Sequence, residues 1–407
     1  MNTKSYIEDL AILGGTPAFA DHLHVGRPNI GSRDNLFARI NDIFDRRWLT
    51  NNGPMVQEFE RQLAAHLHVK HCVAVCNGTI GLEIAIRALD LTGEVIMPAM
   101  TFIATAHALR WQGIKPVFAD VLPGSHNLDP NSVAALITPR TTGILGVHLW
   151  GIPCDIDALT ELAETHHLKL LFDAAHAFGC SYQDQMIGNF GDAEVFSFHA
   201  TKFCNSLEGG AIATNNDELA AKMRAMRDFG FVEQDFTGYV GTNGKMNEVS
   251  ATMGLTSLES VDTFIETNYR NYKTYQQALA GVPGIRFVRY DEAQHNNYQY
   301  IILEVDPYEA GISRDELVTI LKAEHVLARR YFYPGCHRME PYLSDPATNH
   351  DLPLTECVVS QTMGLPTGTA ITQDAIRQIC AIIRLVVAQA AHIRPHLMAD
   401  PVVLPAL

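Results

Sequence analysis

The sequence predicts an α/β protein in which a large domain with a mostly parallel sheet is followed by a smaller α+β domain. Between about residues 70 and 215, short apolar runs alternate with segments of helical spacing, which favours parallel strands covered by helices on both faces. After a long helical stretch from Asn247 to Ala280, the pattern changes to strands, a helix, an irregular segment rich in Pro, Gly and Tyr, and a last helix. We therefore expect an N-terminal arm and large domain at 1–262, and a small domain at 263–407.

The expected strands of the large domain are near-continuous apolar runs, as strands buried on both faces must be. They lie at residues 72–75, 95–100, 116–121, 142–151, 169–176, 193–200 and 209–215. Segments with a period near 3.6 predict helices between them at 80–91, 104–113 and 155–167. In the small domain we expect strands at 285–289 and 297–305, and helices at 313–326 and 372–391.

Composition excludes several classes of protein. The chain has 407 residues, 47% of them hydrophobic and 18% charged, which is enough to bury a sizeable core. Its formal net charge of −15 would repel nucleic acids and anionic membranes, so we expect neither as a partner. Glu8 and Asp9 interrupt the N-terminal segment, and no uncharged apolar run reaches the roughly 18 to 20 residues of a membrane span, so we expect a soluble, cytoplasmic protein.

Neither cysteine nor histidine forms a metal-ligand pattern. The eight cysteines include no CxxC pair, and the 18 histidines include no HExxH motif. We therefore expect no metal site. Walker-type and GxGxxG motifs are also missing from the sequence, which disfavours a nucleoside triphosphate or a Rossmann-bound dinucleotide.

Candidate ligand-binding residues lie where strands of a parallel sheet would end, the edge at which such sheets bind ligands. Gly78 and Thr79 open a helix and could hold a phosphate, or simply form a helix start. Asp173 closes a very apolar strand and needs a cation or several donors, which could come from a ligand or from a structural ion pair. Ser197 ends the next strand and leads to Lys202, which is either an amine of lowered pKa or an ordinary surface lysine.

Taken together, these residues favour pyridoxal 5′-phosphate (PLP) as a cofactor. The cofactor requires a lysine that forms a Schiff base, an acid that keeps its ring nitrogen protonated, and donors for its phosphate. A glycine-rich turn at 238–248, GYVGTNGKMNE, precedes the long helix and is either a loop with a helix cap or a further part of the site.

The chain resembles the DegT/DnrJ/EryC1/StrS family of PLP-dependent nucleotide-sugar aminotransferases, which have the aspartate-aminotransferase fold (fold type I) with a seven-stranded sheet. The similarity extends from LTNNGPMVQEFE at 49–60 to LPTG at 365–368. Its most specific part is FDAAHAFG at 172–179, followed by GDAEVFSFHATK at 191–202 and EGGAIATN at 208–215.

The resemblance implies a role for each matching residue. Lys202 would be the Schiff-base lysine and Asp173 the partner of the ring nitrogen. Ser197, Gly78 and Thr79 would bind the phosphate, Phe102 would stack on the ring, and His176 would approach the ring hydroxyl. The substrate would lie near Arg329, Arg330, Tyr331, Tyr333 and His337.

The family's GxNxRM segment is here Gly241-Thr242-Asn243-Gly244-Lys245-Met246. In relatives its asparagine reaches the phosphate in the neighbouring subunit, so the resemblance implies a homodimer with shared active sites. Lys245 replaces the family's arginine, which keeps the charge but loses the bidentate fork.

The implied reaction transfers an amino group from L-glutamate to a nucleotide-linked keto-sugar. The segments GVHLWG at 146–151 and NNGP at 51–54 resemble those of enzymes that aminate C4 of a dTDP-4-keto-6-deoxyhexose. Amination at C3 and amination of a cyclitol ketone remain alternatives. A sugar dehydratase is disfavoured because those relatives replace the lysine by histidine, and a non-catalytic binding protein is disfavoured because every matched position carries a competent residue.

Overall fold

A seven-stranded sheet forms the centre of the larger part of the molecule. The computed structural model describes residues 2–348 and 351–398. β10 is antiparallel to both of its neighbours, β2 and β9, and all other neighbours pair in parallel, so six strands run in one direction. The predicted mostly parallel sheet is therefore confirmed. In spatial order the strands are β2 (His71–Val75), β10 (Gly210–Thr214), β9 (Ala193–Ser197), β6 (Lys169–Asp173), β5 (Thr141–Val147), β3 (Glu94–Pro98) and β4 (Lys115–Ala119).

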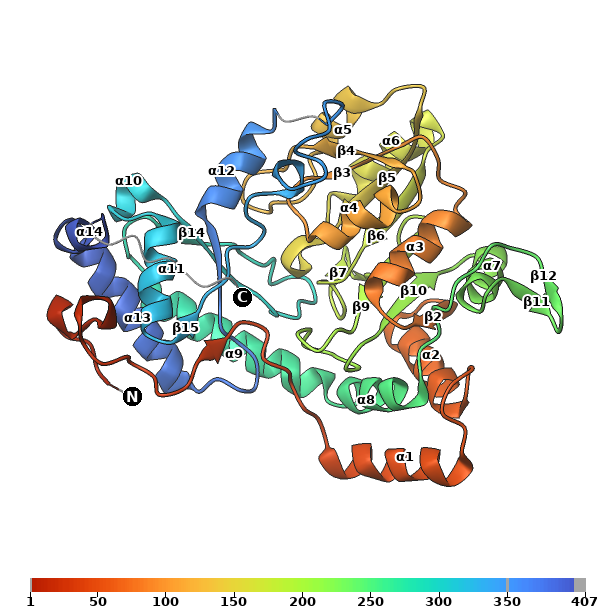
Figure 1. Cartoon of the computed structure of the whole chain (residues 1–407), viewed down its shortest axis with the longest axis horizontal. Coiled ribbons are helices and arrows are strands. Elements are labelled where there is room, and N and C mark those ends of the chain that lie inside the picture. The colour runs from red at the N-terminus through yellow and green to blue at the C-terminus, as the bar shows by residue number, and fades with distance from the viewer. Residues whose placement is uncertain (1, 349–350, 399–407) are drawn as a thin grey trace.

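Helices cover both faces of this sheet, which explains why its strands are apolar throughout (Figure 1). One face packs against α3 (Gly78–Ala88), α4 (Ile103–Arg110) and α7 (Asp217–Arg227). The other face packs against α2 (Pro54–Leu67), α5 (Pro130–Leu136), α6 (Ile156–His166) and α8 (Glu248–Leu258).

The carboxyl ends of the six like-directed strands share one edge of the sheet. The turns that follow β2, β3, β5, β6 and β9 therefore lie at that edge, and they contain nearly all the candidate residues of the large part.

The smaller part is built on a three-stranded antiparallel sheet. Its strands are β13 (Ile285–Phe287), β14 (Ile301–Val305) and β16 (Thr362–Leu365), with β14 in the middle. Helices α9 (Val261–Leu279), α11 (Arg314–Ala323) and α13 (Gln373–Ala388) contribute the buried apolar residues that pack around this sheet. The remaining elements here are α10 (Pro307–Ala310), β15 (Val326–Leu327), the short 3-10 turn Cys336–Arg338, α12 (Pro353–Gln361) and α14 (Ala390–Met398).

The segment expected to be irregular contains α12 and β16. The sequence did not predict β16. Its four residues, TMGL, are all buried and so do not alternate, and they are too few to stand out as an apolar run. It is recognisable only through its pairing with β14.

The long helix expected from Asn247 to Ala280 is in fact two helices, α8 and α9, which separate at Glu259 and Ser260. Ser260 has a non-helical ψ of 4°, and this backbone conformation separates the two helices. The last helix also differs from expectation, because the chain bends by 89° after α13 and continues as α14. Within the described residues, no straight helix is long and apolar enough to cross a membrane.

The N-terminal arm packs on the small part. β1 (Leu23–His24) pairs in parallel with β15, and Leu10, Ala18 and Phe19 join the small part's apolar cluster. Two short 3-10 turns, Ile7–Asp9 and Ala11–Leu13, precede β1. The division at residues 262 and 263 remains our proposal, with the first part of the arm lying on the second unit.

A buried ion pair fixes the arm. The Lys4 amine lies 3.1 Å from the Glu324 carboxylate, and both side chains are almost fully buried. The same carboxylate accepts hydrogen bonds from the backbone N–H groups of Ala11 and Ala18, both at 2.7 Å. One carboxylate therefore holds three points of the arm.

Two elements extend from the large part. Helix α1 (Arg33–Arg46) buries only Ile43 and packs along α8. The hairpin β11 (Phe231–Glu233) and β12 (Phe236–Thr237) projects on the side away from the small part (Figure 1). A further small hairpin joins β7 (Ser181–Tyr182) to β8 (Gln185–Met186).

We expect Lys4→Ala to lower the free energy of unfolding by about 3 kcal/mol, because the Glu324 carboxylate would be left buried without its cation. Urea denaturation measures the change. Lys273→Ala, which removes a partner of Glu292 from an ion pair at the surface, is the control and should cost less than about 1 kcal/mol. Equal losses in the two variants would contradict a dominant role for the buried pair.

Candidate active site

Lys202 lies in the turn that follows β9, with its amine inside the protein. Its backbone N–H donates to the carbonyl of His199, which closes the turn. The amine donates to the hydroxyl of Tyr300 at 3.2 Å. Burial lowers the pKa of Lys202 to about 8, although the negative charge of Asp173 opposes this shift. At pH 7 roughly a tenth of the amine is therefore unprotonated and free to act as a nucleophile, far more than for an ordinary lysine.

Asp173 ends β6 and is 8% exposed. One carboxylate oxygen accepts from the Thr105 hydroxyl at 2.8 Å, and the other accepts from the backbone N–H of Ala175 at 3.1 Å. Burial raises the pKa of Asp173, while these two donors and the positive charge of Lys202 oppose that shift. The carboxylate is thus buried with less compensation than its charge requires, and a cationic ligand group would supply the rest.

His176 is held in one tautomer by the backbone. The N–H of Trp150 donates to His176 Nδ1 at 3.2 Å, so the ring proton of the neutral imidazole must lie on Nε2. Burial drives the pKa of His176 well below its ordinary value, and the charge of Lys202 acts in the same direction. His176 is therefore a neutral hydrogen-bond donor at physiological pH.

Aromatic rings from both parts of the molecule surround His176. Trp150 is fully buried and lies nearly parallel to Phe332, at a centroid distance of 5.5 Å. The Tyr300 ring lies 4.4 Å from the imidazole, and the Tyr331 ring lies 6.0 Å from Trp150. Trp150 comes from the large part and the other three rings from the small part, so the site lies where the two parts meet.

The start of α3 and the end of β9 form a narrow cradle. Asn77 caps the helix by accepting from the N–H of Ile80 at 2.9 Å. The N–H groups of Gly78 and Thr79 belong to the first turn and have no helical acceptor. A Cβ added to Gly78 would lie only 3.1 Å from the Cβ of Ser197, so glycine lets the helix start approach the strand end. Backbone N–H groups and two hydroxyls converge there, which suits a phosphate.

Phe102 precedes α4 at the same edge of the sheet. Its side chain is 60% exposed, which is unusual for so large an apolar ring, and its centroid lies 6.3 Å from that of Phe332. The ring is thus available to cover a flat ligand.

Four of the five predicted substrate-binding residues form two pairs of an arginine and a tyrosine. Tyr331 borders the aromatic rings of the site, and the Arg329 guanidinium lies 5.9 Å from the Tyr331 ring. Arg330 lies over Tyr333 and pairs with Asp315 at 3.4 Å. Their side chains are partly or largely exposed.

His337 is fully buried, and its ring lies 3.5 Å from the Glu356 carboxylate. A position of His337 near the substrate stays a prediction.

Asn243 lies at the base of the projecting hairpin and is exposed. The segment that contains Asn243 lies between two neighbours. Lys245 is opposite Val75 of β2, and Asn243 is opposite Asp228, which follows α7. The Lys245 amine pairs with Asp228 at 2.8 Å and lies over the Phe229 ring, so its charge is used within the subunit.

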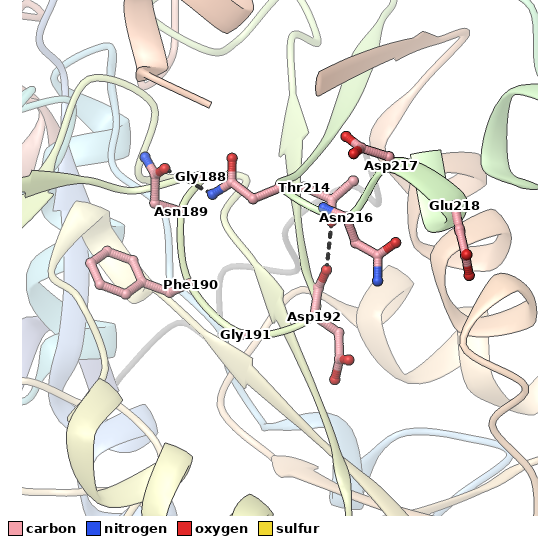
Figure 2. Close-up of a pocket in the computed structure, with 10 residues that line it drawn as sticks. Gly188, Asn189, Phe190, Gly191, Asp192, Thr214, Asn216, Asp217 and Glu218 are labelled. Atoms are coloured by element: carbon pink, nitrogen blue, oxygen red, sulfur yellow. Dashed lines mark hydrogen bonds between the residues drawn. The ribbon is translucent and has the colours of Figure 1, made fainter. Parts of the chain in front are cut away.

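A separate hollow lies at the opposite edge of the sheet, between residues 188–192 and 214–218 (Figure 2). It contains Asp192, Asp217 and Glu218, whose negative charges would repel a phosphate. Among the residues that the structure describes, no group of three or more His, Cys, Asp or Glu side chains is arranged to hold a metal ion.

Three residues of the site were missed by the sequence analysis, namely Thr105, Trp150 and Tyr300. Trp150 and Tyr300 stand in segments that were interpreted as strands. No spacing connects Tyr300 with Lys202, because their contact exists only when the small part lies on the large part.

Comparison with known proteins identifies the family. The model of the DegT/DnrJ/EryC1/StrS aminotransferase family matches residues 32–384. A crystal structure of DesI in the presence of its TDP-sugar product is 48% identical, covers 97% of this chain and 100% of its own, and superposes with a TM-score of 0.93.

Two curated relatives cover most of the chain. The dTDP-4-amino-4,6-dideoxy-D-glucose transaminase of Shigella dysenteriae is 37% identical over 89% of this chain and 98% of its own length. The GDP-perosamine synthase of Caulobacter vibrioides is 35% identical over 88% of this chain and 96% of its own. The family match spans both parts of the molecule and all the residues converging on Lys202, and the chain therefore belongs to the DegT/DnrJ/EryC1/StrS aminotransferase family.

Proposed function

We propose that this protein is a PLP-dependent aminotransferase that transfers the amino group of L-glutamate to C4 of a dTDP-4-keto-6-deoxyhexose. The observation that carries the proposal is the convergence of Lys202, Asp173 and the α3 cradle at one edge of the sheet. The names of the similar Shigella transaminase and of DesI support the dTDP-linked acceptor. The Caulobacter relative acts in GDP-perosamine synthesis by its name, so a GDP-linked acceptor is the second candidate.

The residues present fit PLP. The donor set at Gly78, Thr79 and Ser197 suits the phosphate, and the absence of a Cβ at Gly78 leaves room for close approach. The under-compensated carboxylate of Asp173 suits a protonated ring nitrogen, and the exposed ring of Phe102 suits stacking. His176 offers its Nε2 proton to an oxygen acceptor such as the ring hydroxyl.

When bound, PLP supplies an aldehyde that bonds reversibly to amines and a ring that withdraws electrons from the adjacent carbon. The Lys202 amine would hold the cofactor, and when free it would be the base that takes a proton from the Cα of the amino donor. Its lowered pKa makes this possible at neutral pH. In the second half-reaction the same amine returns a proton to the sugar carbon.

Tyr300 keeps the Lys202 amine in place. Burial holds the pKa of Tyr300 well above its ordinary value, so its hydroxyl stays protonated. A hydroxyl can accept from an ammonium and donate to an amine. Tyr300 can therefore hold Lys202 in both protonation states that proton transfer requires.

We further propose a homodimer in which Asn243 reaches the phosphate site of the partner. Large apolar side chains are exposed on and after α1 and, separately, on and after the hairpin, and such exposed apolar groups are typical of protein–protein interfaces. They include Phe37, Phe44, Trp48, Phe231, Val232, Phe236 and Val240. Asn243 lies at the base of that hairpin, so a copy that covers these side chains would approach it. A cytoplasmic location remains a prediction from the sequence.

Purified protein supplied with PLP and L-glutamate should aminate dTDP-4-keto-6-deoxyglucose faster than its GDP-linked counterpart. Product analysis by chromatography and mass spectrometry measures both rates. A preference for the GDP-linked sugar would reverse the assignment of the nucleotide, and failure to form 2-oxoglutarate from glutamate would remove the aminotransferase proposal.

Lys202→Ala should lower turnover at least about a thousandfold, because both proton transfers lose their base. The variant should still retain PLP non-covalently, since the phosphate cradle is intact, and desalting followed by absorbance detects it. Lys169→Ala, which changes an exposed lysine paired with Asp192, is the matched control. A Lys202→Ala enzyme with near-normal turnover would refute the proposed role.

Asp173→Asn should lower the pKa of Lys202 below about 8, because the negative charge that raises it is removed. The pH dependence of Lys202 carbamylation by cyanate in cofactor-free protein, followed by peptide mass spectrometry, measures this pKa. A rise in the pKa would show that the two groups do not interact as the structure indicates.

Mixing Lys202→Ala and Asn243→Ala subunits should restore about one quarter of wild-type activity after subunit exchange, since random pairing gives hybrids with one complete site. If Asn243 served its own subunit, hybrids would contain no complete site and activity would not return. The two parent variants assayed alone are the controls.

A further inference from the structure

Asn29 is a buried residue at which three segments distant in the sequence meet. Its side chain belongs to the N-terminal arm and is 2% exposed. It contacts the turn that carries Lys202 on one side and the small part's loop at 367–369 on the other. No role for this residue follows from the motifs of the sequence.

The arm follows the turn that carries Lys202. The side-chain Nδ2 of Asn29 donates to the backbone carbonyl of Phe203 at 3.1 Å. The backbone carbonyl of Asn29 accepts from Asn205 Nδ2 at 2.9 Å. A Cβ added to Gly26 would lie 3.0 Å from the Thr201 Cβ, and its φ of +72° is one that favours glycine. The arm is thus in contact with this turn on both sides of Lys202.

The amide oxygen of Asn29 faces the small part. It accepts from both the backbone N–H and the hydroxyl of Thr369, each at 2.9 Å. The neighbouring carbonyl of Gly368 accepts from Asn271 Nδ2 at 3.1 Å, which ties the loop to α9. The Asn29 side chain therefore connects the turn with the small part, because its amide nitrogen donates to the turn and its amide oxygen accepts from Thr369.

Only an amide of this length satisfies both sides at once. A carboxylate would still accept from Thr369 but would face the Phe203 carbonyl without a proton, and an apolar side chain would leave buried partners unpaired. We infer that Asn29 is a positioning residue that fixes the turn carrying Lys202 and couples it to the small part, which supplies Tyr300. The inference rests on the proposed role of Lys202.

Hydrogen exchange in cofactor-free protein tests the first half of this inference. The reporters are the amides of Lys202 and Ser206, which donate to the carbonyls of His199 and Phe198. Asn29→Asp should accelerate their exchange about tenfold relative to wild type, as expected from the loss of one buried hydrogen bond. Asn189→Asp is the control, because the Asn189 amide likewise donates to backbone carbonyls, those of Leu67 and Met186, but lies at the opposite edge of the sheet.

A second variant guards against misfolding of the first. Thr369→Val removes one of the two donors that orient the amide, keeps the contact with Phe203, and should accelerate the same amides less than Asn29→Asp does. Unchanged exchange in both variants would overturn the inference. Uniform acceleration throughout the protein would also overturn it, because Asn29 would then be a general stabiliser.

The pKa of Lys202 is a second measurement. It should not change if Asn29 only stabilised the fold. Loosening the turn admits water, so the carbamylation midpoint of Lys202 should rise in Thr369→Val, which adds no charge near Lys202 and therefore cannot raise the pKa electrostatically. An unchanged midpoint in Thr369→Val contradicts the inference. Both measurements use protein without cofactor, so their failure is distinguishable from a failure of the proposed reaction, which Lys202→Ala tests separately.

Discussion

The burial of the Lys202 amine close to the carboxylate of Asp173 is the constraint on which the rest of the site depends. Each group alone would be costly to remove from water, and each lowers the cost of the other's charge. Parallel strands make the arrangement possible, since β6 and β9 are neighbours whose carboxyl ends coincide. The compensation is incomplete, which leaves Lys202 partly unprotonated and Asp173 in need of a cation. The same imbalance that weakens the folded protein provides the chemistry.

The surroundings of these two charges come from far apart in the chain. Thr105 on α4 donates to Asp173, Tyr300 of the small part binds the Lys202 amine, and Trp150 fixes the tautomer of His176. The small part therefore supplies the hydroxyl that accepts from the Lys202 amine. The N-terminal arm packs on the small part through Lys4 and Glu324, and it reaches the turn of Lys202 through Asn29.

A protein with a negative net charge can bind an anionic molecule only where hydrogen-bond donors or cations are concentrated locally. The first turn of α3 supplies N–H groups and hydroxyls for a phosphate within a molecule of net charge −15. On the small part, Arg329 and Arg330 provide cations near Tyr331 and Tyr333, while Lys245 is neutralised within its own subunit by Asp228. The hollow of Figure 2, lined by three carboxylates, lies away from these donors.

The patterns of the chain were sufficient for the large part of the fold and for the central residues of the site. All seven strands of the main sheet were expected near their observed positions, because apolar runs and helical periods are local signals. Lys202, Asp173, Ser197 and Gly78 could be proposed as site residues because strand ends and helix starts are visible in the sequence, and the structure places them at one edge of the sheet. The break between α8 and α9 was missed, since the non-helical backbone of Ser260 leaves no mark on the hydrophobic pattern.

What the sequence by itself determined is therefore the fold class, the family and the residues at the strand ends. Only the tertiary structure decided which side chains complete the site. Tyr300, Trp150 and Asn29 make contacts between segments that are distant along the chain, and the burial of His337 was likewise visible only in the structure. The physical reason is that local patterns record secondary structure and burial, whereas a hydrogen bond between two parts exists only once those parts are packed together.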